Sequence, residues 1–260
     1  MNNIDDETTE TTHPEPLKLP AIDRYGWREI IVKYFSQPEF QYHVPSPQRK
    51  LSLPNTEIAK KTYEHAKLKI DPMTMNHSIR IFLYMRAVIY DYFPDWNIDE
   101  EVLYVVALLH YSQIEALRER ESKMTAALLT GVEAYEFMLR VTHGNKEYAG
   151  AICEAICRQQ ATFEGKGYTT SLCFILQTTV MIDCVGDYNF SRLIHPETLH
   201  WINTQYPRKG WMKCLNTALA LEFYGKPWGL SSTLEEGFLD RFKVNKLAYT
   251  HDELDDGDSE

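Results

Sequence analysis

The sequence NHSIRIFLYMRAVIYDYF, residues 76–93, decides the fold of this chain. Ile81, Tyr84 and Val88 follow His77 by four, seven and eleven residues, which places all four on one face of an α-helix. Pro94 follows directly, and a helix ends at or before the residue that precedes a proline. We therefore predict a helix over 76–93 that carries an imidazole on its apolar face near its start.

The helical period continues on both sides of this segment, and alternating strand patterns are missing throughout. Asp71-Pro72, His143-Gly144-Asn145 and the turn at 164–167 act as stops between segments. The other helices are predicted at about 56–70, 99–116, 121–141, 146–161, 169–188, 196–206 and 210–224. The predicted fold class is therefore all-α.

The helical body is predicted to lie between two acidic tails. Residues 1–20 and 251–260 contain little to bury, so we expect both to be disordered. Residues 21–55, with four prolines, are expected to form an extended arm with a short helix near 26–36. Residues 56–250 then form one helical domain. After Leu230 it is expected to include one more docked segment, carried by Phe238, Phe242, Leu247 and Tyr249.

Charge and cysteine usage exclude several classes of protein. The net charge of −10 arises in the tails, which hold eleven of the 37 acids and leave 26 acids against 27 Lys and Arg. Without a basic stripe, nucleic acid is not an expected partner. The first residues are polar and acidic and no run of 18 apolar residues occurs, so neither an export leader nor a membrane span is expected. The five cysteines lack CxxC spacing, which indicates reduced core residues and a cytoplasmic or nuclear location.

Three polar side chains fall where the pattern predicts burial. His77 and His110 lie on apolar helix stripes, and Asp183 lies deep in an otherwise apolar helix. A buried carboxylate is costly unless it is paired or binds a metal, and imidazole and carboxylate are good ligands for zinc, iron or manganese. If the three converge, they predict a divalent-metal site. Taken singly, a histidine on an apolar face is more often a hydrogen-bonded core residue than a ligand, and a lone Asp can simply bond a neighbouring backbone group or Arg. The three together leave both interpretations open.

Seven short motifs extend across the body of the chain. In order they are Asn76-His-Ser-Ile-Arg80, Phe93-Pro-Asp-Trp96, Glu101-Val-Leu-Tyr104, Leu108-Leu-His110, Gly165-Lys-Gly-Tyr168, Ile175-Leu-Gln177 and Lys226-Pro-Trp-Gly229. Over roughly residues 50–250 this set resembles the fungal cyanamide hydratase family, within the HD-domain superfamily of metal-dependent hydrolases. The resemblance implies an HD-type helical domain and descent from a hydratase that adds water across a nitrile-like carbon. It also implies zinc or iron held by His77, His110 and Asp183, with Lys166 and Tyr168 contacting the substrate.

Three short motifs depart from the pattern of that family. Where the family has His-Asp, this chain has His110-Tyr111. At residues 158–160 the family has Arg-His-Gln and this chain has Arg-Gln-Gln. At residues 125–127 the family has Ser-Phe-Glu and this chain has Thr-Ala-Ala. Losing the carboxylate at Tyr111 removes an anion that binds metal, so we expect metal binding to be weakened or lost. Losing the imidazole at Gln159 removes a group that moves protons near neutral pH.

Three functions remain compatible with the sequence. The first, which we favour, is a divergent enzyme of specialised metabolism that acts on a different small molecule, with Tyr111, Gln159 and Arg80 as its polar catalytic groups. The second is a non-catalytic binding protein that keeps only the fold. The third is a hydratase with an altered ligand set, in which a Tyr111 phenolate or Asp187 replaces the lost carboxylate. The sequence leaves open whether the chain forms a homo-oligomer.

Overall fold

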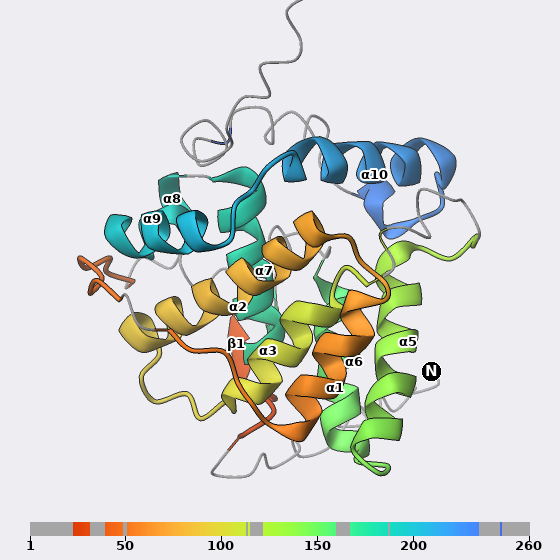
Figure 1. Ribbon diagram of the computed structural model, residues 1–260, viewed down its shortest axis with the longest axis horizontal. Helices are drawn as coiled ribbons and strands as arrows, with labels where there is room; N and C mark the ends of the chain where they lie inside the picture. The colour runs from red at the N-terminus through yellow and green to blue at the C-terminus, as the bar shows by residue number, and fades with distance from the viewer. Residues whose placement is uncertain are drawn as a thin grey trace, which may run out of the picture.

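The computed structural model describes residues 23–31, 40–48, 51–112, 114, 122–159, 167–186, 188–233 and 245. Most of this part of the chain is helical (Figure 1), so the predicted all-α class is confirmed. The helices are α1 (Glu57–Lys67), α2 (Pro72–Tyr92), α3 (Glu100–Leu109), α5 (Ala126–Val141), α6 (Lys146–Arg158), α7 (Ser171–Val185), α8 (Tyr188–Ser191), α9 (Pro196–Gln205), α10 (Trp211–Gly225) and the short 3-10 helix η2 (Leu230–Thr233). None of the described helices is both long and apolar enough to cross a bilayer.

The centre of the core consists of α2, α3 and α7, which contact one another. All residues of α3 from Val102 to Leu109 are buried, and so is every residue of α7 except Val180. Helices that are buried on all sides need neighbours on all sides. Here α1, α6 and α9 pack around the three central helices, and α10 lies across one end of the bundle (Figure 1).

Helix α2 begins four residues before the predicted start. The Asp71 carboxylate accepts a hydrogen bond from the backbone N–H of Thr74 at 2.9 Å and caps the helix. Pro72 follows at the first helical position, where the missing N–H costs nothing. The pair read as a helix stop in the sequence is therefore a helix start, and His77 lies in the second turn of α2.

Helix α3 ends earlier than predicted, at Leu109. The backbone N–H of His110 still bonds to Val106, but Ser112 and Ile114 bond only three residues back, to Leu109 and Tyr111. The chain therefore turns as soon as α3 ends. This turn places His110 and Tyr111 directly after the buried stretch Val102–Leu109 of α3.

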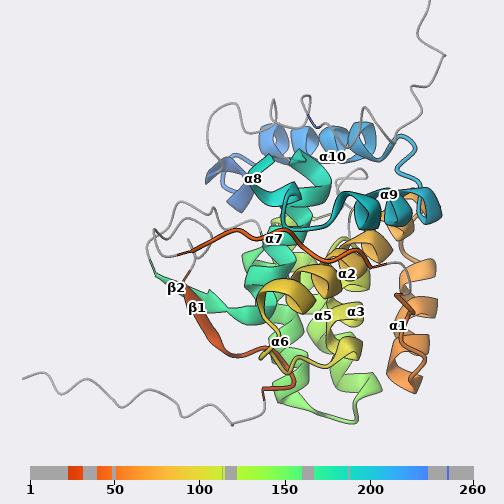
Figure 2. The same cartoon turned by 90° about the vertical axis from the view of Figure 1, so that its left-hand side faces the viewer.

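The predicted helix near 26–36 is wrong for the residues that are described. Residues Glu29–Ile31 form β1, which pairs antiparallel with β2 (Tyr168–Thr170), with Ile30 opposite Thr169 (Figure 2). Gly26 has a φ of +75°, and a Cβ at this position would lie 2.7 Å from Cβ of Leu172. The chain therefore approaches the start of α7 too closely for a helix, and pairing with β2 satisfies its backbone instead.

The remaining arm residues, 40–48 and 51–55, contain no helix or strand. They are held against the body by contacts such as the Tyr92 hydroxyl, which donates to the carbonyl of His43 at 2.9 Å. Both predicted tails lie outside the described residues, as does the segment carrying Phe238, Phe242, Leu247 and Tyr249. After residue 233 only Asn245 is described, and it is fully buried.

Candidate metal centre and adjoining pocket

The Asp183 carboxylate lies fully buried on α7 and accepts four hydrogen bonds. Its Oδ1 accepts from Nε of Arg80 at 2.9 Å and from a terminal nitrogen of Arg208 at 2.7 Å. Its Oδ2 accepts from a terminal nitrogen of Arg80 at 2.9 Å and from Nδ1 of His77 at 2.7 Å. Burial opposes the charge, but the Arg208 and Arg80 guanidiniums hold the pKa of Asp183 well below its ordinary value. The group is therefore an ionised, fully engaged carboxylate.

The His77 imidazole is held by stacking as well as by this hydrogen bond. Its ring centroid lies 4.0 Å from that of Trp211, with the planes 18° apart. Burial lowers the pKa of His77 to about 4, despite the opposing effect of Asp183. The ring is therefore neutral at pH 7. Because an ionised carboxylate can only accept, the proton of neutral His77 lies on Nδ1 and its Nε2 carries a lone pair.

The same reasoning applies to His110. Its Nδ1 lies 2.6 Å from the carbonyl oxygen of Ala107, which can only accept, so Nδ1 carries the proton. Burial and the proximity of His77 lower the pKa of His110 well below its ordinary value. Its Nε2 therefore also carries a lone pair, and it lies 3.1 Å from Nε2 of His77. Two lone pairs thus face each other in the core.

These two nitrogens fit a divalent metal ion. Histidine ligands usually donate their second nitrogen to a carboxylate or a backbone carbonyl, as both rings do here. Two nitrogens bound to one ion at about 2.1 Å lie about 3.0 to 3.4 Å apart, which includes the observed separation. His77, Asp183 and Cys184 also lie close enough together for one ion. In that set the Asp183 oxygens are already shared by two arginines, and burial raises the pKa of the Cys184 thiol. The histidine pair is therefore the better start of a metal site.

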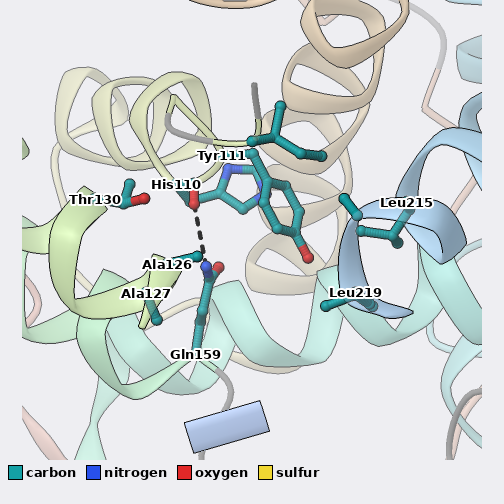
Figure 3. A pocket seen from close by; sticks show the side chains of 10 residues that line it. His110, Tyr111, Ala126, Ala127, Thr130, Gln159, Leu215 and Leu219 are labelled. Atoms are coloured by element: carbon teal, nitrogen blue, oxygen red, sulfur yellow. Dashed lines mark hydrogen bonds between the residues drawn. The ribbon is translucent and has the colours of Figure 1, made fainter. Parts of the chain in front are cut away.

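A small pocket adjoins His110 and Tyr111 (Figure 3). Ten residues line it: His110, Tyr111, Ile114, Ala126, Ala127, Thr130, Gln159, Leu215, Ala218 and Leu219. It encloses about 310 Å³ with its open mouth, yet its free space admits only about one water molecule. Burial raises the pKa of Tyr111 well above its ordinary value, so the phenol keeps its proton. Nε2 of Gln159 donates to the carbonyl oxygen of His110 at 3.1 Å.

Comparison with known proteins shows the family to which the chain belongs. No protein-family model matches the chain. The chain is 38% identical over 207 residues to cyanamide hydratase DDI2 of Saccharomyces cerevisiae, an alignment that covers 80% of this chain and 91% of the yeast protein. The chain belongs to the cyanamide hydratase family. Cyanamide hydratase DDI3 of the same yeast matches to the same extent. The wider relationship to the HD superfamily stays a prediction.

In this member of the cyanamide hydratase family the three predicted metal ligands come together from α2, the end of α3 and α7. Whether they bind metal stays a prediction. Arg80, predicted as a catalytic group, is fully buried, and its nitrogens donate to Asp183 and to the carbonyls of Tyr206 and Pro207. It does not line the pocket that holds Tyr111 and Gln159.

Of the two predicted substrate contacts, Tyr168 and Lys166, only Tyr168 is described. Tyr168 is 58% exposed on β2 and does not line the pocket beside His110. Lys166 and Asp187 lie outside the described residues. Sequence reasoning missed Arg208 and Trp211, which hold Asp183 and His77. Arg208 stands between Pro207 and Lys209-Gly210, a polar turn by composition, so no local signal marked it as buried.

Proposed function

We propose that this chain binds a small molecule other than the family's usual substrate, in the pocket beside His110, and is not a standard cyanamide hydratase. One observation carries the proposal. Tyr111, Ala127 and Gln159, which stand where the family pattern has Asp, Glu and His, line the same pocket as His110. They come from the end of α3, the start of α5 and the end of α6, so only the fold brings them together. Substitutions that meet in one pocket favour a changed ligand over unrelated drift.

The chemistry of the remaining groups supports the same proposal. Hydration needs a group that takes a proton from water, ideally with a pKa near the working pH. The Tyr111 phenol has a raised pKa, which suits it to donating a hydrogen bond rather than to taking up a proton. The Gln159 amide has no proton to exchange near neutral pH. The pocket is thus better equipped to bind and orient a molecule than to activate water.

The histidine pair favours a second candidate, a metal-dependent hydratase with an altered ligand set. His77 and His110 would hold the ion through Nε2, and Asp183 would orient His77 rather than ligate. A bound divalent ion would act as a Lewis acid and lower the pKa of water. The resemblance also suggested zinc or iron as the ion. Against this candidate stands the engagement of Asp183 by Arg80 and Arg208, which leaves it with little capacity to bind a cation.

Metal analysis combined with a cyanamide assay tests the proposal. We expect purified protein supplemented with zinc or iron to hold less than about a tenth of an equivalent and to form no urea from cyanamide. The triple variant Tyr111→Asp, Ala127→Glu, Gln159→His should bind more metal. The control Tyr224→Asp, Gln205→His repeats two of the three kinds of change at exposed positions of α10 and α9 and should not bind more metal. Stoichiometric metal and cyanamide turnover in the wild-type protein would refute the proposal.

A role in specialised metabolism is part of the same proposal. Genes for synthases and oxidases next to the gene for this chain would support it. If the protein binds small molecules in this pocket but converts none of the substrates or products of the enzymes that those genes encode, a non-catalytic binding protein is favoured instead.

A further inference from the structure

Gln159 has one buried polar atom that is not satisfied. Its Nε2 faces the carbonyl oxygen of His110, and because a carbonyl only accepts, this contact fixes which way the amide is turned. Oε1 must then face away from His110, toward the side on which Tyr111 lies (Figure 3). This oxygen is buried and has no hydrogen-bond partner in the described part of the chain. A buried acceptor without a donor is costly, so a ligand that supplies a donor has a strong advantage here.

The rest of the lining selects against charge. None of the ten lining residues is Lys, Arg, Asp or Glu, and six of them are alanine, leucine or isoleucine. Among the described lining residues, a charged ligand would therefore find no partner for its charge. The enclosed free space is about that of one water molecule, so a larger ligand must be small and must extend into the open mouth of the pocket.

We propose that the pocket selects a small neutral ligand through an N–H group that donates to Oε1 of Gln159, as a primary carboxamide does. This inference rests on the proposed function, because it assumes that the pocket is a ligand site. The Tyr111 hydroxyl is the second polar contact and donates to an acceptor on the ligand, such as the carboxamide oxygen. A nitrile that lacks N–H leaves Oε1 unsatisfied, and a carboxylate brings a second acceptor against it. Gln159 is therefore the residue that determines specificity.

Three probes of similar size separate these cases: acetamide, acetonitrile and acetate. Ligands this small bind in the millimolar range, so affinity is measured by backbone chemical-shift titration of the isotope-labelled full chain. We expect acetamide to bind at least about tenfold more tightly than acetonitrile, and acetate not to bind. Gln159→Leu should bring the ratio between acetamide and acetonitrile to about one. Tyr111→Phe should weaken both, because both carry an acceptor.

Gln177→Leu is the matched control. The Gln177 amide is also buried and also donates to a backbone carbonyl, that of Arg158 at 2.6 Å, but it does not line the pocket. This variant should keep the wild-type ratio. Equal binding of acetamide and acetonitrile to the wild-type protein overturns the inference, as does no binding of any probe up to about 100 mM. Neither result concerns metal content or cyanamide turnover, which test the proposed function separately.

Discussion

Replacing Asp183 with asparagine tests the central feature of this structure, a buried carboxylate shared by two arginines. Asparagine has nearly the same shape but presents one acceptor oxygen and one NH₂ donor. The carboxylate accepts two hydrogen bonds at each oxygen. In the variant, an NH₂ group replaces either Oδ1 or Oδ2, so that a donor faces the N–H donors that the carboxylate oxygen accepted from. The negative charge between the guanidiniums of Arg80 and Arg208 is also lost.

The expected cost is large because none of these groups can turn to water. Asp183, Arg80, Arg208 and His77 are all fully buried. Removing one partner of a buried ion pair costs about 3–5 kcal/mol, and here the change leaves two guanidiniums without their anion. We therefore expect Asp183→Asn to lower the free energy of unfolding by at least about 3 kcal/mol at pH 7.

The assay is urea denaturation at equilibrium, after dialysis against a chelator so that metal loss does not contribute. The matched control is Asp95→Asn, because Asp95 also pairs with an arginine, Arg28 at 2.6 Å, but its side chain is 72% exposed. An exposed pair contributes at most about 1 kcal/mol, so this variant should change little. Arg208→Met leaves Asp183 paired with Arg80 and should fall between the two. If Asp183→Asn and Asp95→Asn differ by less than about 1 kcal/mol at equal m-values, the reasoning is wrong.

Three further predictions concern packing, titration and capping. Gly131→Ala should lower the free energy of unfolding by about 1–3 kcal/mol, because the new Cβ would lie 2.3 Å from Sγ of Cys157. Combining it with Cys157→Ala should restore most of the lost stability. Gly150→Ala, whose Cβ meets only ordinary van der Waals contacts, should be neutral or stabilising in the same urea assay. Burial raises the pKa of Glu222, although Ala126 N–H and Lys226 oppose this, so the folded state holds the carboxyl proton more tightly than the unfolded state. The stability of the wild-type protein relative to Glu222→Gln should therefore fall as pH rises above about 4.5. A stability difference between the two proteins that is constant from about pH 4 to 7 contradicts this. Asp71→Ala should cost about 1 kcal/mol, read from the urea midpoint, because α2 loses its N-terminal cap.

The helical period of the sequence determined the all-α class and the approximate extent of most helices. This was possible because an amphipathic helix repeats its signal over several turns within one segment. The same signal placed His77, His110 and Asp183 on buried faces, and all three are at most 1% exposed. Helix ends were less predictable. Asp71-Pro72 is compatible with a stop or a start, and the packing of α2 decides which.

The contacts between segments far apart in the sequence, including those around these three residues, were decided by the tertiary structure. The strand pair β1 and β2 joins residues 29–31 to residues 168–170, and three-residue strands carry no periodic signal. Arg208 reaches Asp183 from a turn 25 residues further along the chain, and Gln159 reaches His110 across 49 residues. The sequence could establish that a carboxylate and two imidazoles are buried, because burial follows from local pattern. It could not establish that the carboxylate is already neutralised, because that depends on side chains that only the folded chain brings within hydrogen-bond distance.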